Sequence, residues 1–585
     1  MKGFFGRILH IDLGSSSYYV EELADEVYER FLGGKGLATH LLLANLPPKI
    51  NPFSSENILI FALGPVTDSK IFGSCRYGVF TKSSLTGYYS ESYAGGKAAE
   101  PMSRTGYDAV ILQGAAPSPT LLEISDTGIT FHDASDLWGL DTNEAEDSAL
   151  ERVKTPHRKA ALVIGPAGER LVRFAVIGND HGRQAGRTGV GAVMGAKRIK
   201  GIVFHGTQNR EIAKPDLIDR FAKEIQERGK KDPGALAYKQ FGTPQLVAVM
   251  NRAKGFPSRY WSQGTLEGWE RISADALLKE CRVKSKACPR CFMACGELSE
   301  VTKGRHKGLR IEGPEYETIY AFGGLCLVTD INEIIYLNNI CDRLGMDTIT
   351  AGNLAAFTIE AARRGKIAEK IDYGDVDAIA SLLQQIARRE GIGEVLAQGI
   401  VHAAKTWSLE DIAIHVKGLE PAGYDPRVLK GMGLAYATSD RGACHLRTTF
   451  YKPELAGIIN PDQIEGKAEL LVEYEDRLVI FDSLIICRFY RDMYPWEKLA
   501  TIVEGTTGLR LYRVGLRKIA SQIMDNTRRF NLREGLTKAD DILPIRFHQE
   551  PLPETGKVIT KEQMEKLLAD YYCYRGWDSE GRPST

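Results

Sequence analysis

The chain has 585 residues, of which 43% are hydrophobic and 26% are charged, a composition typical of a soluble globular protein with several domains. Lysine and arginine together number 75, as do aspartate and glutamate, so the net charge is zero. Without a basic excess, neither nucleic acid nor an anionic membrane surface is an expected partner. The apolar run 58–66 is far shorter than the ~20 residues that span a bilayer, and the first residues lack the apolar segment of a signal peptide. We therefore expect a cytoplasmic protein with no membrane segment.

Short apolar runs punctuated by glycine and proline predict β-strands over roughly the first 210 residues. The predicted strands are 8–13, 57–63, 109–113, 160–164, 171–177 and 201–205. Apolar residues spaced by threes and fours after Pro215 predict helices instead. The predicted helices are 217–228, 235–253, 331–344, 353–364, 376–389 and 470–481.

This order of elements predicts an α+β protein, in which a β-rich N-terminal domain precedes a mainly helical remainder. The segment 417–427 is rich in glycine and proline and marks a second boundary. We expect a β-rich domain at 1–210 and two mainly α-helical domains at 211–416 and 417–585.

Three of the ten cysteines form a CxxCxxxC motif within 288–295. Thiolates at this spacing can bind one face of a compact metal centre while a fourth ligand comes from elsewhere. The third cysteine favours a 4Fe-4S cluster, and a structural zinc site closed by Cys281 or His306 is the alternative. Cys487 lies among apolar residues and is a candidate for the fourth thiolate, although a lone buried cysteine is more often a packing residue.

A glycine-rich segment, 182–198, holds five closely spaced glycines together with Arg183 and Arg187 just before an expected helix. It has neither the P-loop pattern nor the GxGxxG pattern. Free backbone amides and arginines can still bind a phosphorylated cofactor there, and Arg76 adds another cation. The alternative is a tightly packed loop with solvated arginines.

Two further segments carry groups suited to proton transfer. In 311–318, Pro314 fits the first helical position, with Glu315 and Glu317 in the first turn, where acids usually do no more than complement the helix dipole. His445 lies among small residues on an expected loop. A single histidine is more often structural than catalytic, and spacing alone does not pair it with Glu317.

These segments together resemble the aldehyde ferredoxin oxidoreductase family, whose members carry a tungsten bis-pterin cofactor (tungstopterin, a molybdopterin-type group) beside a 4Fe-4S cluster. The resemblance extends along nearly the whole chain. It is carried by the motifs FLGGKG at 31–36, TKSSLTG at 81–87, GPAGE at 165–169, GAVMG at 191–195, EGPEYE at 312–317, RGACH at 441–445 and YYCYRGWD at 571–578.

The resemblance implies that the β-rich domain is a base for the cofactor and that the two helical domains cover it. Each pterin is then bound by a DxxGL(D/C)-type motif. The first resembles 342–347, with Met346 in place of leucine, and the second resembles 482–487, with Ile485 where glycine is usual. In the glycine-rich segment, Gln184 stands where the family often has arginine.

Site residues are carried over from the family one by one. The resemblance implies cluster ligation by Cys288, Cys291, Cys295 and Cys487, and catalysis by Glu317 as general base with His445 as hydrogen-bond or proton donor. The implied cofactor contacts are Arg76, Tyr93, Gly95, Gln184, Ala185, Gly186, Arg187, Asp342, Gly345, Asp347, Arg447, Asp482 and Ile486. A magnesium ion that bridges the pterin phosphates is expected on the main-chain carbonyls of Tyr93 and Ala185.

The activity implied by the resemblance is the oxidation of an aldehyde and water to a carboxylate under anaerobic conditions. Electrons pass through the cluster to ferredoxin or to a small iron-sulfur subunit. Two alternatives stay open: a catalytic tungsten subunit of a larger reductase complex that acts on aromatic thioesters, and a zinc-stabilised binding protein without redox activity. The particular aldehyde, the choice of tungsten over molybdenum and the oligomeric state have no sequence signal, and a homodimer is one expectation.

Overall fold

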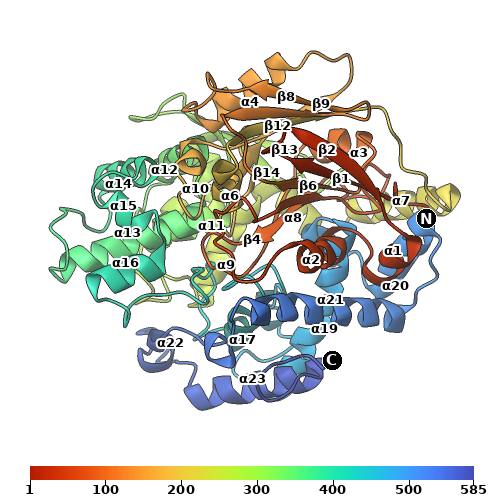
Figure 1. Cartoon of the computed structure of the whole chain (residues 1–585). Helices are drawn as coiled ribbons and strands as arrows, with labels where there is room; N and C mark the ends of the chain where they lie inside the picture. Colours follow the sequence, from red (N-terminus) through yellow and green to blue (C-terminus); the bar gives the residue numbers. More distant parts are fainter. Residues whose placement is uncertain (585) are drawn as a thin grey trace. The chain divides into compact units, whose positions relative to one another are not determined.

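Two mixed β-sheets form the N-terminal part of the chain in a computed structural model that describes residues 1–584 (Figure 1). In the first sheet the strand order is β2-β1-β6-β3-β4-β5, and β1 is parallel to β6 while the other neighbours are antiparallel. Its strands are β1 Arg7–Asp12, β2 Ser17–Glu22, β3 Leu59–Ala62, β4 Tyr77–Lys82, β5 Tyr89–Ala94 and β6 Ala109–Gln113.

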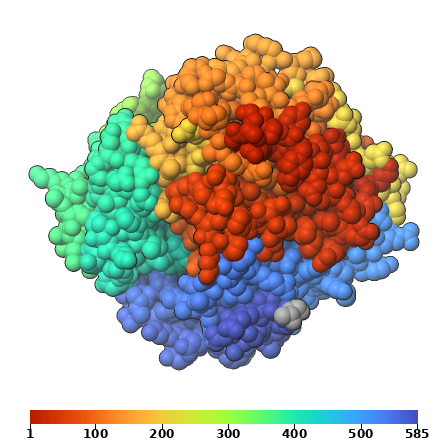
Figure 2. All heavy atoms as spheres, in the orientation of Figure 1, coloured from red at the N-terminus to blue at the C-terminus, as the bar shows by residue number. Residues whose placement is uncertain are grey.

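The second sheet has the order β11-β10-β9-β12-β7-β8, with β12 parallel to β7 and the other pairs antiparallel. Its strands are β7 Thr120–Ile124, β8 Ile129–Asp133, β9 Lys159–Val163, β10 Ile177–Asn179, β11 Arg183–Ala185 and β12 Ile199–His205. In the space-filling view the two sheet regions, red and orange, cover neighbouring parts of one face (Figure 2).

Side chains that alternate between the two faces of each strand let the sheets pack in four layers: helix α2 (Gly34–Asn45), the first sheet, the second sheet and helix α4 (Thr142–Arg152). Leu59 and Phe61 join a core that the two sheets share, whereas Ile60 points to the opposite face and packs with helix α2. On the second sheet, Leu121 likewise packs on the outer face with helix α4. Successive side chains of a strand point to opposite faces, so each sheet is buried on both sides and its central strands read as continuous apolar runs.

By their contacts, residues 1–584 form two compact units, which do not follow chain order. Unit 1 consists of 1–237, 287–294 and 476–534, and unit 2 consists of 238–286, 295–475 and 535–584. Unit 1 therefore contains both sheets together with a short piece of the cysteine segment. The three-domain division expected from the sequence stays a prediction.

Helices complete unit 1 around a second apolar core, to which Phe221, Ile480 and Ile523 belong. The helices of this unit, with α8 and α19 continuing into unit 2, are α1 Asp25–Phe31, α2, α3 Ala99–Arg104, α4, α5 Pro166–Glu169, α6 Val190–Ala196, α7 Pro215–Gly229, α8 Pro233–Phe241, α19 Lys467–Leu484, α20 Trp496–Thr507 and α21 Arg513–Arg533. A short 3-10 helix, Arg488–Tyr490, follows α19. Helix α21 packs against α2, so the late segment of the chain covers the first sheet's helix.

Unit 2 is mainly helical and contains an antiparallel sheet of β13 Cys281–Lys286, β14 Gly296–Val301 and β15 Arg310–Glu312. Its helices are α9 Leu246–Arg252, α10 Ala274–Glu280, α11 Tyr316–Thr318, α12 Ile331–Leu344, α13 Thr348–Arg363, α14 Val376–Arg388, α15 Gly393–Leu396, α16 Ile400–Trp407, α17 Lys430–Thr438, α18 Tyr451–Leu455, α22 Ile545–Gln549 and α23 Lys561–Arg575. A π-helical turn, Ile319–Gly324, follows α11, and short 3-10 helices occur at Thr243–Gln245, Trp269–Ile272 and Lys538–Asp540.

The predicted α+β class is confirmed. Most of the predicted segments coincide with observed strands or helices. The expected strand 171–177 is wrong, because the strand in this region, β10, begins only at Ile177. The expected helix 235–253 is interrupted at Gly242, whose φ of 55° no regular helix accommodates. Among residues 1–584, no helix combines the length and the apolar character that crossing a membrane requires.

Replacing Lys467 by methionine is expected to destabilise unit 2, because the Glu454 carboxylate would then be buried without its cation. Lys467 Nζ lies 2.7 Å from Glu454 Oε1, and both side chains are 0% exposed. Removing one partner of a buried pair costs about 3–5 kcal/mol. Thermal unfolding followed by circular dichroism should show a lower midpoint. Lys566→Met, which removes the exposed partner of Asp570, is the matched control. Equal midpoints for the two variants would contradict the prediction.

Candidate active site and cysteine cluster

The predicted site residues fall into two sets. The first set lies in unit 1 and includes Cys288, Cys291, Cys487 and Arg76. The second lies in unit 2 and includes Glu317, His445 and both acids of the first pterin motif. Cys295 belongs to unit 2, so the CxxCxxxC motif contributes to both units.

The three cysteines of unit 1 gather around the loop that follows β3. The backbone N–H of Cys487 donates to the carbonyl of Gly73 at 2.9 Å, which fixes the segment after α19 on this loop. Arg76 Nη1 lies 3.8 Å from Cys487 Sγ. The backbone N–H of Gly96 donates to Cys288 Sγ at 3.3 Å, and a Cβ at the adjacent Gly95 would lie 3.1 Å from the same sulfur.

The thiols of this set have unequal acidities. A hydrogen bond with Cys75 and the charges of Arg183 and Arg76 lower the pKa of Cys288 to about 6, against the effect of burial. Burial and the neighbouring Cys487 raise the pKa of Cys291 to about 11. Cationic groups and N–H donors thus stabilise a thiolate at Cys288, which is the protonation state that binds metal.

Among residues 1–584, no three His, Cys, Asp or Glu side chains converge on one point as they would around a single metal ion. A 4Fe-4S cluster makes a different demand, because each thiolate binds a different iron of a larger body. The donors around these sulfurs, Gly96 N–H, the Tyr490 hydroxyl at 3.3 Å from Cys291 and Arg76, are of the kind that hydrogen-bond cluster thiolates.

The glycine-rich segment serves packing to a large extent. A Cβ at Gly189, Gly191 or Gly195 would lie within 2.2 Å of a backbone oxygen in 168–176, so these glycines permit close contact between backbones. Gly189 also has a positive φ of 78° before α6, a helix of seven residues. Arg187 precedes it and is buried, with its backbone N–H donating to Ser92 Oγ at 3.2 Å.

The second pterin motif begins near the end of α19, where Asp482 forms an ion pair with Arg488. Ile485 directly follows the last residue of α19 and has a positive φ of 58°, a backbone conformation in which glycine is usual. Glycines of the early FLGGKG motif touch this turn: a Cβ at Gly34 would meet the Asp482 carbonyl at 2.2 Å and the Ile485 side chain at 2.7 Å. The early motif is thus explained by close packing on the second pterin motif.

In unit 2 the first pterin motif is the joint between two helices. Helix α12 ends at Gly345 with a φ of 79°, and Asp347 caps α13 by accepting from Ile349 N at 3.1 Å. Asp342 Oδ2 accepts from Asn338 Nδ2 at 2.6 Å. Capping accounts for Gly345 and Asp347 locally, while the motif's role toward a cofactor stays a prediction.

Glu317 and His445 lie side by side in unit 2. His445 Nε2 is 3.4 Å from Glu317 Oε1, and the side chains are 11% and 15% exposed. The other carboxylate oxygen, Oε2, accepts from the backbone N–H of Gly423 at 2.9 Å. His445 lies on the loop between α17 and α18, as expected from the sequence.

The expected helix register around Pro314 is wrong, because α11 begins at Tyr316 and Glu315 is its N-cap residue with extended backbone angles of −76° and 156°. The two glutamates nevertheless have different partners. The Glu315 carboxylate accepts from the Thr243 hydroxyl, whereas Glu317 faces His445.

Tyrosines surround this carboxylate. The Tyr424 ring stacks at 5.7 Å on His445 and at 4.1 Å on Tyr451, and Tyr316 and Tyr320 donate to the carbonyls of the 421–423 segment. Burial, with the charge of Glu317 as a further cause, raises the pKa of Tyr316 and of Tyr424 well above the usual 10. These phenols therefore stay neutral and act only as hydrogen-bond groups.

Sequence reasoning missed a buried cysteine beside the histidine. Cys444 Sγ lies 2.9 Å from Arg441 Nη2, and the Leu446 N–H donates to it at 3.3 Å. Burial alone would raise its pKa, but the charges of Arg441 and Arg447 outweigh that effect and lower the pKa to about 7. The two arginines in the RGACHLR segment were the available signal. The sulfur anchors the loop that holds His445.

Comparison with known proteins gives matches over the whole chain. The family model described as aldehyde ferredoxin oxidoreductase, N-terminal domain, matches residues 8–206, and the model for domains 2 and 3 of the same family matches 220–585. A tungsten-containing aldehyde ferredoxin oxidoreductase of Pyrococcus furiosus is 34% identical over 100% of this chain and 98% of its own. An aliphatic sulfonate oxidoreductase WOR-like subunit of the same organism is 27% identical over 100% and 96%.

A solved structure has the same fold. It is the active site complex BamBC of benzoyl coenzyme A reductase with 1,5-dienoyl-CoA, with a TM-score of 0.86, 22% identity and coverage of 100% of this chain and 96% of that one. At this level of identity the likeness concerns the fold alone.

Proposed function

Since this chain belongs to the aldehyde ferredoxin oxidoreductase family, we propose that it oxidises an aldehyde and water to a carboxylate and passes the electrons to a ferredoxin or a small iron-sulfur protein. The observation that carries this proposal is the pairing of Glu317 with His445, 3.4 Å apart and largely shielded from solvent. Such a carboxylate and imidazole pair can handle the protons that this oxidation releases.

The residues present fit the two cofactors that the family implies. In unit 1, the thiols of Cys288, Cys291 and Cys487 each have a hydrogen-bond donor beside them, and with Cys295 they are our proposed cluster ligands. In unit 2, the buried hydroxyls of Ser439, Thr448 and Thr449 have no hydrogen-bond partner in the described part of the chain. A buried hydroxyl without a partner is costly, so a polar ligand beside the His445 loop suits these groups.

We assign the pterin contacts to the residues that the family pattern selects. In unit 1 these are Arg76, Tyr93, Gly95, Gln184, Ala185, Gly186, Arg187, Asp482 and Ile486, and in unit 2 they are Asp342, Gly345, Asp347 and Arg447. When bound, the tungsten bis-pterin group supplies two-electron acceptance and the cluster supplies one-electron transfer. The Tyr93 carbonyl accepts from Arg76 Nη2 at 3.0 Å, and because a carbonyl oxygen has two lone pairs, this bond is compatible with the magnesium ion that we propose there.

The roles of the two catalytic side chains follow from their partners. Gly423 N–H binds one oxygen of Glu317 and leaves Oε1 directed toward His445. We propose that Glu317 takes a proton from water or from the hydrated aldehyde. His445 Nε2 then donates a hydrogen bond or a proton to the substrate oxygen as charge develops on it. The stacked Tyr424 ring limits rotation of the imidazole and keeps Nε2 in position.

Protein purified without oxygen is expected to contain tungsten and about four irons per chain, and to reduce benzyl viologen when an aldehyde is added. Elemental analysis by mass spectrometry and dye reduction at pH 7 measure the two properties on one sample. Carboxylate formation should account for one product per two dye molecules reduced. A preparation that contains zinc alone, or metal-replete protein that oxidises none of a panel of aliphatic and aromatic aldehydes, would refute the proposal.

A further inference from the structure

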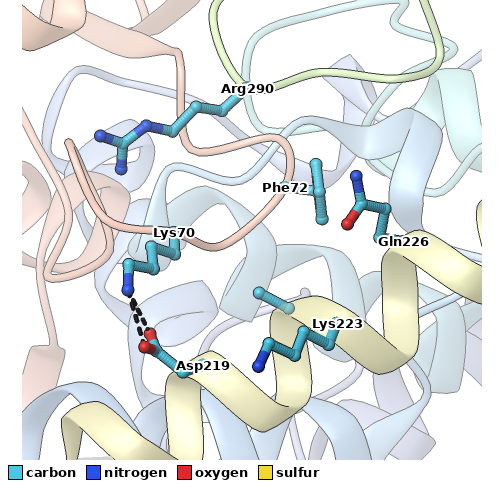
Figure 3. Close-up of a pocket in the computed structure, with 7 residues that line it drawn as sticks. Lys70, Phe72, Asp219, Lys223, Gln226 and Arg290 are labelled. Carbon is cyan, nitrogen blue, oxygen red and sulfur yellow. Dashed lines mark hydrogen bonds and ion pairs between the residues drawn. The ribbon is translucent and has the colours of Figure 1, made fainter.

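A surface pocket of about 270 Å³ lies in unit 1, outside the set of residues assigned above (Figure 3). Helix α7 supplies Asp219, Lys223 and Gln226, the loop after β3 supplies Lys70 and Phe72, and the cysteine segment supplies Arg290. The pocket is smaller than typical small-molecule sites of ~300 Å³ or more, and its rim is mostly long polar side chains.

Phe72, which lines this pocket, is linked by short contacts to Cys291 and Cys487. The Phe72 ring lies 4.8 Å from Phe292 and 6.5 Å from Tyr490, measured between ring centroids. The Tyr490 hydroxyl donates to Cys291 Sγ at 3.3 Å. One residue after Phe72, the Gly73 carbonyl accepts from the N–H of Cys487 at 2.9 Å. Phe72 thus connects the pocket with Cys291 through the Tyr490 side chain, and with Cys487 through the backbone of the adjacent Gly73.

The rim carries an excess of positive charge. Lys70, Lys223 and Arg290 are exposed, against one carboxylate, Asp219, which pairs with Lys70 at 2.7 Å. Arg290 Nη1 donates to the Ser69 carbonyl, so its guanidinium is held at the rim. The nearest acids on α7 are already compensated, since Glu224 pairs with Lys498 and Glu227 with Lys230. In a chain of zero net charge this is a local cationic surface.

We propose that this pocket is the docking surface for a small acidic one-electron carrier protein, an inference that rests on the proposed function. A half-buried aromatic residue within a cationic rim has the apolar centre and polar border of a protein interface. Redox partners form small, transient interfaces, and complementary charge speeds their encounter. Each turnover converts one aldehyde and one water to a carboxylate, three protons and two electrons, so two oxidised carriers dock in succession and leave reduced.

The test changes the charge of the rim in both directions. Lys223→Glu is expected to raise the KM for an acidic ferredoxin with a single 4Fe-4S cluster about 10-fold at low ionic strength, while Asp219→Asn lowers it about 2-fold. Both effects should shrink as salt is added. Lys154→Glu, an exposed substitution in unit 1 that is not part of the pocket, is the matched control. Aldehyde-dependent reduction of benzyl viologen should be unchanged in Lys223→Glu.

Titration calorimetry of the oxidised ferredoxin into the holoenzyme, without aldehyde, separates this inference from the proposed function. Weaker binding by Lys223→Glu than by Lys154→Glu supports the docking surface whether or not any aldehyde is oxidised. Equal affinities of Lys223→Glu and the unchanged protein, or an equal loss in the Lys154→Glu control, would overturn it. If the unsubstituted holoenzyme oxidises no aldehyde with either dye or ferredoxin as the electron acceptor, the proposed function alone is refuted.

Discussion

Replacing Glu317 by glutamine should lower aldehyde turnover by about 10²- to 10⁴-fold, because an amide cannot take the proton that the carboxylate accepts. The structure favours a clean result. The glutamine side chain would keep a carbonyl oxygen for the Gly423 N–H, which donates to Glu317 Oε2 at 2.9 Å, so the loop should remain in place. The measurement is kcat with benzyl viologen at saturating aldehyde, on protein whose tungsten and iron contents match those of the unchanged chain.

The matched control is Glu315→Gln, two residues earlier. Glu315 occupies the N-cap position of α11 without a side-chain capping bond, and its carboxylate accepts from the Thr243 hydroxyl. Weakening that charge-assisted hydrogen bond should cost stability and change turnover little. His445→Asn should reduce turnover as Glu317→Gln does. If Glu315→Gln has the larger effect on kcat, or if neither Glu317→Gln nor His445→Asn lowers it in metal-replete protein, the acid-base assignment is wrong.

The second large effect concerns the cluster. Cys291→Ser and Cys487→Ser are each expected to abolish the broad brown absorbance and the electron-spin signal of the reduced protein, because a serine hydroxyl is a far poorer ligand for iron than a thiolate. Cys573→Ser replaces an exposed cysteine on α23 and should leave both signals intact. Visible absorption and electron paramagnetic resonance of dithionite-reduced samples, normalised to protein, measure the outcome.

A cluster that persists in both Cys291→Ser and Cys487→Ser would exclude this ligand set. If only one of the two variants loses the signal, the cysteine replaced in the other variant is not a ligand, and another residue takes its place. Cys75 is the nearest alternative, because it is buried and hydrogen-bonds with Cys288.

Sequence periodicity predicted the strands that are buried on both faces. Strands such as β6 and β12 lie inside a four-layer arrangement and therefore read as short apolar runs. Strand β2 has the sequence SYYVEE, with exposed or half-exposed side chains, and gave no such signal. Around Pro314 the proline suggested a helix start two residues early, because the chain stays extended through Glu315.

The candidate site shows a similar division. Close spacing in the CxxCxxxC motif predicted a group of thiols, but the position of Cys487 against Gly73 depends on a long-range backbone contact that spacing does not encode. The same holds for Glu317 and His445, which tertiary packing brings to 3.4 Å. The contact of Cys444 with Arg441 was within reach of the sequence, since both belong to one short loop, yet only the fold shows that their groups are buried together.

Ile485 affects whether this chain is found by a search for the DxxGL(D/C)-type motif, because it stands at the position where that motif usually has glycine. A branched side chain at a φ of 58° is a costly choice, yet the turn between Asp482 and Cys487 keeps the positive φ that Gly345 has in the first motif. The packing of Gly34 against this turn holds it in place. A search pattern that requires glycine at this position would discard the chain. In this chain the turn of the motif is therefore set by the surrounding contacts, and it does not depend on a glycine at its positive-φ position.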